Sequence, residues 1–143
     1  MAIEVTVEHL GAVQFEVKAR NHTIVCDQPE SAGGFDEGMT PPEMLLASLG
    51  TCAGYYAVEY LKARNLPLEG LRVRVTADKA PARSNVPVRL NDFLIEVEYA
   101  QPVEPRHRDG ISRAVHACLI HNTLLYPPRI EVAVVGPAPA LAA

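Results

Sequence analysis

Three cysteines are the residues of this chain best suited to chemistry: Cys26, Cys52 and Cys118. An odd number of cysteines, with no basic and apolar leader after Met1, argues against a secreted disulfide scaffold. We therefore expect a cytoplasmic protein whose cysteines are reduced. In that setting a cysteine serves as a small core residue, as a metal ligand or as a reactive thiol.

Cys52 and Cys118 fall on the apolar faces of two predicted helices, and packing of those helices would bring the thiols together. A thiolate that attacks a peroxide becomes a sulfenic acid, and a second thiol condenses with it to a disulfide. Two cysteines on facing helices suit this chemistry, although their spacing alone does not show that they face each other. The alternative interpretation is that both thiols are core residues, because free cysteine is among the most buried residue types.

His121 allows a different use of the same thiols. It follows Cys118 by three residues, so the two share a helix face, and with Cys52 they can form a Cys-Cys-His metal site. A Cys-x-x-His pair on one helix is a weak signal, however, and the sequence offers no fourth ligand. We therefore predict neither a metal nor a cofactor. Cys26, beside Asp27 on a predicted strand, is interpreted as structural.

Two charged residues are candidates to act on a thiol. Glu43 follows Thr40 by three residues, a spacing that forms a capping box at the start of a helix, and its carboxylate can also orient a cation. Arg20 lies at a predicted turn after the second strand, where a solvated turn residue is the plainer interpretation. A reactive thiolate needs a nearby cation, and Arg20 is the candidate for that role.

The longest predicted element is a helix from Pro41 to about Arg64, which carries the second cysteine. Pro41 suits the first helical position, and Thr40 can cap the helix with its hydroxyl. No charged residue lies between Glu43 and Glu59, so the helix is apolar nearly all round and is predicted to be a buried central helix. One small sheet cannot cover so much apolar surface, so we expect a second subunit to cover part of it.

Alternating apolar and polar residues predict strands on both sides of this helix. Three strands precede it, over residues 3–7, 13–17 and 22–26, and two follow it, over residues 71–75 and 93–99. A second helix is predicted from Asp109 to about Leu124, and a last strand over residues 130–134. The order β-β-β-α-β-β-α-β predicts a single α+β domain over residues 1–143 rather than a doubly wound sheet.

Composition excludes several classes of protein. The chain has 143 residues, of which 48% are hydrophobic, so it holds enough apolar material for a core and is not disordered. The net charge of −4 and the absence of tryptophan argue against a nucleic-acid binder. No run approaches the roughly 18 apolar residues of a membrane span, so no membrane partner is expected.

Two segments resemble motifs of the OsmC/Ohr family, the osmotically inducible and organic hydroperoxide resistance proteins. Residues 40–52, TPPEMLLASLGTC, resemble that family's central-helix motif, and residues 117–124, ACLIHNTL, resemble its second cysteine motif. The order of strands and helices also matches along nearly the whole chain, and the likeness is greatest to the OsmC-like branch. The resemblance implies an OsmC-like fold, an intertwined homodimer and active sites at the subunit interface.

The same resemblance implies a thiol peroxidase that reduces organic hydroperoxides with a dithiol, such as a lipoyl group, as reductant. Cys52 would be the peroxidatic cysteine and Cys118 the resolving one, and the other catalytic residues would be Arg20 and Glu43. The residues expected to carry the alkyl part of the substrate are Leu49 and Tyr56. The alternative is a non-catalytic OsmC-like dimer that binds a small apolar ligand or a protein thiol at the subunit interface.

Overall fold

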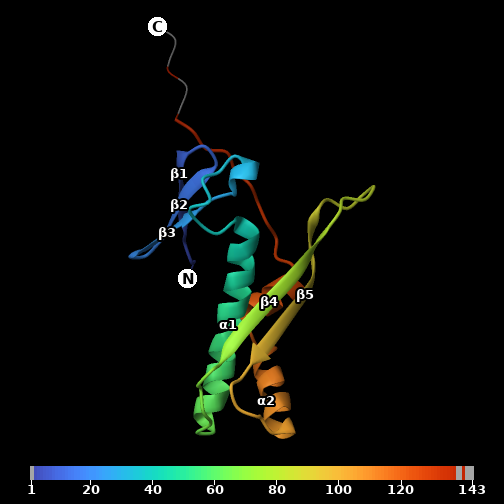
Figure 1. Ribbon diagram of the computed structural model, residues 1–143. Helices are drawn as coiled ribbons and strands as arrows, with labels where there is room; N and C mark the ends of the chain where they lie inside the picture. The colour runs from blue at the N-terminus through green and yellow to red at the C-terminus, as the bar shows by residue number, and fades with distance from the viewer. Residues whose placement is uncertain (1, 138–139, 141–143) are drawn as a thin grey trace.

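The computed structural model describes residues 2–137 and 140 of the chain. Within them, a three-stranded antiparallel sheet leads into a long helix, a two-stranded sheet and two further helices (Figure 1). The elements are β1 (Thr6–Gly11), β2 (Gln14–Ala19), β3 (His22–Cys26), the short 3-10 turn η1 (Glu30–Ala32), α1 (Pro41–Ala63), β4 (Arg72–Ala80), β5 (Arg89–Glu98), α2 (Pro105–Val115) and α3 (Leu119–Leu125). This mixed arrangement confirms the predicted α+β class.

Helix α1 begins at the predicted capping box. The backbone N–H of Thr40 donates to the Glu43 carboxylate at 2.8 Å, and the N–H of Glu43 donates to Thr40 Oγ1 at 3.5 Å. Pro41 takes the first helical position, where a backbone N–H has no helical acceptor. The helix ends at Ala63, with Arg64 as its C-cap, so its predicted bounds are confirmed to within a residue.

The core follows one face of α1, where small residues recur at four-residue steps. Ala53 and Ala57 are fully buried, and they pack with Leu61 against Ile111 and Val115 of α2. Small side chains at this spacing let the two helices approach closely. The opposite face stays open, so this chain alone buries only one side of the predicted central helix. Among the described residues, no helix combines the length and hydropathy needed to span a membrane.

A break after α2 contradicts the single helix predicted over residues 109–124. Helix α2 starts earlier, at Pro105, which fits a first helical position, and it ends at Val115. Cys118 has the extended angles φ −57° and ψ 127° and acts as the N-cap of a separate helix, α3. The one-helix prediction is wrong because the apolar spacing continues through residues 116–118, whereas the helical backbone is interrupted there.

Strands β4 and β5 form a long antiparallel ribbon whose loop end extends beyond the N-terminal end of α1 (Figure 1). Val75 lies opposite Ile95, and the register shifts by one residue between Thr76 and Asp78. The pairing continues to Ala80 and Arg89, so both strands are longer than the alternating pattern predicted, and the loop between them is correspondingly shorter. The apolar face of this ribbon lies beside α1.

The predicted last strand, over residues 130–134, is not formed within this chain. Ile130, Val132 and Val134 are 81%, 89% and 99% exposed, and the segment runs from α3 toward the N-terminal sheet (Figure 1). Its alternating pattern is that of a strand, but a strand needs a neighbour to accept and donate its backbone hydrogen bonds. Within the described residues of one subunit it has none.

Asp27 fixes the loop that leads from β3 to α1. Its buried carboxylate accepts the N–H of Gln28 at 2.8 Å, the N–H of Phe35 and of Glu37, each at 3.1 Å, and the Gln14 side-chain amide, also at 3.1 Å. Burial raises the pKa of Asp27, but these hydrogen bonds outweigh burial and hold the pKa below its usual value. The glycine-rich loop is therefore ordered around one buried carboxylate.

Candidate functional site

The structure brings Cys52 and Cys118 together, from two different helices. Cys52 lies half-buried near the middle of α1, and Cys118 is completely buried at the N-terminus of α3. Both thiols are free, and they lie close enough for the Cys118 side chain to lower the pKa of Cys52. Cys118 Sγ also accepts the backbone N–H of His121 at 3.4 Å, as expected of an N-cap.

The surroundings of the two sulfur atoms separate their pKa values. Burial raises the pKa of the Cys52 thiol, but hydrogen bonds from the Cys118 thiol and from the N–H groups of Ile120 and Leu119 outweigh it. The pKa of Cys52 therefore lies below its ordinary value. Burial and the hydrogen bond with Cys52 raise the pKa of Cys118. Cys52 is thus the thiol that ionises first, with Cys118 as a hydrogen-bond donor to its thiolate.

The break between α2 and α3 supplies two of these donors. Leu119 and Ile120 are the first two residues of α3, and the N–H groups of a helix's first turn have no partner inside the helix. Because α3 begins against α1, these N–H groups are available to the Cys52 sulfur. An uninterrupted helix would have used them in its own hydrogen bonds, so the break is part of the site's construction.

Glu43 lies away from the thiols within this subunit. It lies nine positions before Cys52 in the same helix, which corresponds to about two and a half turns and roughly 14 Å along the axis, and places the two side chains on opposite faces. Its carboxylate instead binds the N–H and the hydroxyl of Thr40, at 2.8 and 3.0 Å. The N–H bond, more than the hydroxyl bond, lowers the pKa of Glu43 below its usual value.

Arg20 also lies away from the thiols within this subunit. It occupies the turn between β2 and β3, with φ 54°, and its side chain is exposed. This turn points away from α1 (Figure 1). No hydrogen bond or ion pair among the described residues links the guanidinium to Cys52 or to any other side chain. A role for Arg20 at the thiols therefore requires a second subunit.

Leu49 and Tyr56, the expected substrate contacts, differ in position. Leu49 is buried at 1% exposure one turn before Cys52 and lies on the wall of a large pocket. Tyr56 is half-buried and packs edge-on against Tyr55 with 5.3 Å between ring centroids, and it does not line that pocket. Only Leu49 therefore sits where it can contact a ligand beside the thiols.

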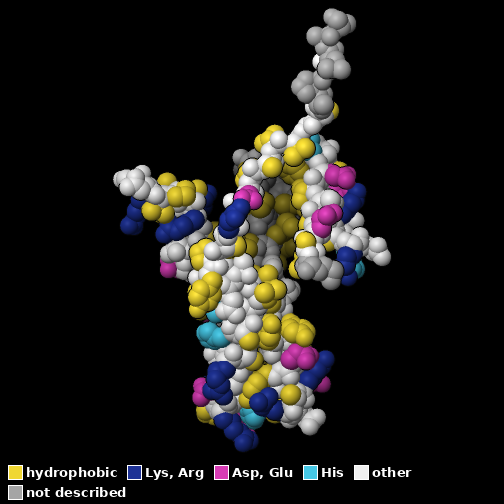
Figure 2. All heavy atoms as spheres, turned by 180° about the vertical axis from the view of Figure 1, so that it is seen from behind, with side chains coloured by type: hydrophobic (Ala, Val, Ile, Leu, Met, Phe, Trp, Pro, Cys, Tyr) yellow, Lys and Arg dark blue, Asp and Glu magenta, His cyan; other side chains and the backbone are white. Residues whose placement is uncertain are grey.

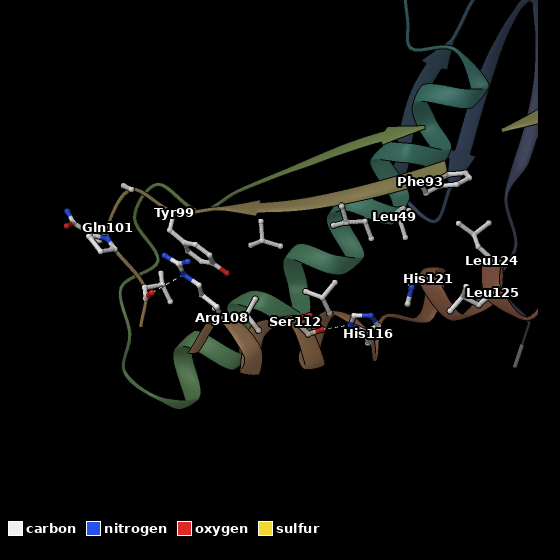
Figure 3. Close-up of a pocket in the computed structure, with 17 residues that line it drawn as sticks. Leu49, Phe93, Tyr99, Gln101, Arg108, Ser112, His116, His121, Leu124 and Leu125 are labelled. Atoms are coloured by element: carbon white, nitrogen blue, oxygen red, sulfur yellow. Dashed lines mark hydrogen bonds between the residues drawn. The ribbon is translucent and has the colours of Figure 1, made fainter. Parts of the chain in front are cut away.

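The pocket is a cleft of about 1020 Å³ between the inner face of β5 and helices α1, α2 and α3 (Figure 3). Most of its wall is apolar, and the apolar lining residues include Leu49, Phe93, Ile95, Val97, Ile111, Val115, Leu124 and Leu125. Phe93 to Tyr99 alternate along β5, so this wall is about 20 Å long. Leu49, one turn before Cys52, and His121, three residues beyond Cys118, line the pocket, whereas neither cysteine does.

Two buried polar atoms of the pocket lack hydrogen-bond partners: Tyr99 Oη and His121 Nδ1. In the described part of the chain no other buried side-chain nitrogen or oxygen is without a partner. Sequence reasoning missed Tyr99 as a site residue, although its place in the alternating 93–99 pattern put it on the inner face of the strand. His121 was considered only as a metal ligand.

The Cys52, Cys118 and His121 side chains do not form a metal site. Among the described residues, no group of three or more His, Cys, Asp or Glu side chains is placed to hold a metal ion. The His121 ring instead packs edge-on against His116, with 5.3 Å between centroids. The chemistry this arrangement can carry out is therefore that of a thiol pair beside an apolar pocket.

Solved structures share this fold at low sequence identity. A protein from Psychrobacter arcticus 273-4, named for osmotic stress induction and detoxification, is 18% identical with a TM-score of 0.75, covering 86% of this chain and 88% of its own. An OsmC-like protein from Mycoplasma pneumoniae is 19% identical with a TM-score of 0.75, covering 87% and 88%. An organic hydroperoxide resistance protein OsmC from Legionella pneumophila is 12% identical with a TM-score of 0.62, covering 87% and 89%.

The sequence itself identifies the family. No curated protein matches the chain. A family model described as OsmC-like protein does match, over residues 34–133, which include α1, both strands of the ribbon, and helices α2 and α3. With its fold shared by solved members and its sequence matched over most of its length, the chain belongs to the OsmC-like protein family.

Proposed function

We propose that this protein is a thiol-dependent peroxidase that reduces organic hydroperoxides, with Cys52 as the peroxidatic and Cys118 as the resolving cysteine. The observation that carries the proposal is the pair of neighbouring free thiols, Cys52 and Cys118, in which the pKa of one is lowered and that of the other raised. A pair of this kind beside an apolar pocket fits peroxide chemistry better than core packing. The name of the Legionella relative, an organic hydroperoxide resistance protein, supports the choice of substrate.

The first step is attack of the Cys52 thiolate on the terminal peroxide oxygen of the substrate. An S–O bond forms and the O–O bond breaks, so Cys52 becomes a sulfenic acid and the substrate leaves as an alkoxide that takes a proton from water. Hydrogen bonds from Leu119, Ile120 and Cys118 stabilise the thiolate before attack. The alkyl part of the peroxide rests against Leu49 in the adjoining pocket.

The second step joins the two cysteines. The Cys118 sulfur attacks the Cys52 sulfur, an S–S bond forms, and the sulfenic oxygen leaves as water with the proton that Cys118 gives up. The contact between the two side chains means that this step needs no large movement of either helix. Reduction of the disulfide then requires two electrons from an external dithiol, such as a lipoyl group, by thiol–disulfide exchange.

The pH dependence of Cys52 alkylation tests the proposed activation. Hydrogen-bond donors that favour the thiolate lower the pKa, so the rate of Cys52 alkylation by iodoacetamide is expected to reach half its maximum at a lower pH than that of a free cysteine, about 8.5. Replacing Cys118 by alanine removes one donor and is expected to raise this midpoint. Mass spectrometry of the alkylated peptides, as a function of pH, measures the midpoint for each cysteine separately.

Cys118→Ser is the matched control, because a serine hydroxyl can still donate to the thiolate. Its midpoint is expected to stay close to that of the unmodified protein, whereas that of Cys118→Ala rises. Equal midpoints in all three proteins would show that the Cys118 side chain does not stabilise the Cys52 thiolate.

We further propose that the active form is a homodimer. The N-terminal sheet makes little contact with the rest of the subunit and exposes several large apolar side chains, namely Val7, Phe15 and Ile24. The segment 130–134 exposes a strand pattern without a partner. A view from behind shows hydrophobic side chains lining an open hollow in the upper half of the molecule (Figure 2). A second subunit that covers these surfaces can also bring Arg20 to the thiols.

Sedimentation equilibrium tests the dimer. The expected mass is twice the 15.5 kDa of the chain at micromolar concentration. Deleting residues 130–143 removes the exposed side chains of Ile130, Val132 and Val134 and is expected to weaken the association. A monomer at these concentrations would contradict the proposal, and Arg20 would then be too far from Cys52 to stabilise its thiolate.

The pocket favours a second candidate function. A cleft of about 1020 Å³ with unpartnered polar atoms is suited to holding a small ligand whether or not the thiols react. The chain would then be a non-catalytic member of the family. That candidate predicts ligand binding with both thiols unchanged by peroxide, which separates it from the peroxidase.

A further inference from the structure

Two backbone carbonyl groups lose their helical partners at the break between α2 and α3. In an unbroken helix the carbonyl of Val115 would accept the N–H of Leu119, four residues later. The carbonyl of His116 would likewise accept the N–H of Ile120. Neither bond is present among the described residues, because Leu119 and Ile120 open α3 and their N–H groups are directed to the Cys52 sulfur. Both carbonyl groups therefore need other donors.

Substitute donors take both positions. The N–H of Cys118 donates to the carbonyl of Val115 at 3.0 Å. The side-chain amide of Asn122 donates to the carbonyl of His116 at 3.3 Å, and this bond runs from α3 back to the C-cap of α2. Since a carbonyl only accepts, the amide nitrogen of Asn122 is the atom that faces it. Asn122 therefore takes the place that the Ile120 N–H would hold in a continuous helix.

The backbone of α3 holds Asn122 in position for this bond. Its N–H donates to the carbonyl of Cys118 at 3.0 Å, and its own carbonyl accepts the N–H of Tyr126 at 2.9 Å. The side chain is half-buried. The amide thus reaches across the break from a residue that is hydrogen-bonded on both sides, so its direction is determined by the helix that carries it.

We infer that Asn122 is a positioning residue of the thiol pair, whose side-chain amide occupies the His116 carbonyl and so leaves the Ile120 N–H free for the Cys52 sulfur. Without that amide, the donor that helical geometry offers to the carbonyl is the Ile120 N–H itself. The Cys52 sulfur would then lose a donor, and its thiolate would be less favoured. The inference rests on the proposed function only because it concerns the same thiol.

The pH dependence of Cys52 alkylation by iodoacetamide tests the inference without any peroxide. Asn122→Leu keeps the size of the side chain but removes its donor. It is expected to raise the midpoint of Cys52 alkylation by roughly half to one pH unit, the effect of losing one hydrogen bond to a charged group. Asn122→Gln keeps an amide and is expected to restore most of the shift. Mass spectrometry of the Cys52 peptide gives the midpoint in each protein.

Thr123→Val is the matched control, on the next residue of the same helix. The Thr123 hydroxyl donates to the carbonyl of Leu119 at 2.8 Å, so its loss removes a bond within α3 and none across the break. The midpoint is expected to stay unchanged. An equal rise in Thr123→Val and Asn122→Leu would overturn the inference, because general loosening of α3 would then be the cause.

An unchanged midpoint in Asn122→Leu would also overturn the inference. His116 is exposed, so water would then have replaced the amide at its carbonyl. If Asn122→Leu does not fold, as its melting temperature shows, Asn122→Ser repeats the test, since its hydroxyl is too short to reach that carbonyl. The same rise in midpoint is expected of it.

The amide proton of Ile120 provides a readout that a merely structural role of Asn122 would not move. In the unmodified protein its NMR chemical shift is expected to change with pH at the midpoint of Cys52 alkylation, because this N–H donates to the sulfur. In Asn122→Leu the pH-dependent change is expected to be lost or strongly reduced. A change of full size in that variant would contradict the inference, whatever the stability of the protein.

The outcomes separate this inference from the proposed peroxidase. If Asn122→Leu raises the midpoint but peroxide leaves both thiols reduced in the unmodified protein, the positioning role stands and the peroxidase fails. If peroxide oxidises the thiols but the midpoint of Asn122→Leu is unchanged, the peroxidase stands and the positioning role fails.

Discussion

Replacing Cys52 by serine is expected to abolish hydroperoxide reduction. A serine hydroxyl is not ionised at neutral pH and cannot form the sulfenic acid, so the rate of tert-butyl hydroperoxide consumption should fall on the order of a thousandfold or more. The assay follows peroxide loss with dithiothreitol as the electron source. The substitution removes one sulfur from a half-buried position and leaves the helix intact, so the fold is expected to persist.

Cys26→Ser is the matched control for this loss. Cys26 is also a free, buried cysteine, but it lies at the end of β3 beside Met39 and away from the thiol pair. Its replacement is expected to leave the rate of peroxide consumption within about twofold of the unmodified protein. A Cys52→Ser variant that keeps its activity, or a Cys26→Ser variant that loses it, would place the reactive thiol elsewhere.

Replacing Gly110 by alanine is expected to lower the free energy of unfolding of the protein. A Cβ at this buried position would overlap the ring and hydroxyl of Tyr60, a residue of α1 that packs against α2. Tyr60 is held in place, because its hydroxyl is 3.2 Å from His107 Nδ1 and Arg64 lies 3.7 Å over its ring. Overpacking of this kind costs typically 1–3 kcal/mol, measured as the free energy of unfolding in urea.

Gly54→Ala is the matched control, because it makes the same change in a helix with room for the methyl group. Its Cβ would lie 3.5 Å from Val73, an ordinary contact, and alanine favours the helix over glycine by roughly 1 kcal/mol. The two variants are therefore expected to shift the unfolding midpoint in opposite directions. A Gly110→Ala variant as stable as the unmodified protein would mean that Tyr60 moves freely and does not lock α1 to α2.

The sequence predicted the parts of the fold that depend on local chemistry. The Thr40–Glu43 capping box and Pro41 determine the start of α1, and both act within four residues, so they can be read directly. Period-two alternation likewise predicted the strand over residues 13–17, and the turn after it indicated a short strand over residues 22–26. Cys52 was predicted to lie on a helix and does, whereas Cys118 was predicted in the middle of a helix and instead caps α3.

What the sequence did not predict depends on contacts between distant segments. The break at Cys118 is invisible in the apolar spacing, yet it turns the N–H groups of Leu119 and Ile120 toward Cys52. The pocket exists only because β5 and α2 lie side by side. The strand pattern over residues 130–134 was correct as a pattern, but within one subunit it meets no neighbour.

The intact mass of the protein after brief exposure to limiting tert-butyl hydroperoxide tests the central claim most directly. The account predicts a loss of two hydrogens, and peptide mapping should assign it to a bond between Cys52 and Cys118. In Cys118→Ser the same treatment should instead add one oxygen to Cys52. An unchanged mass, with both thiols still free, would contradict the account and show that this fold is maintained here without peroxide chemistry.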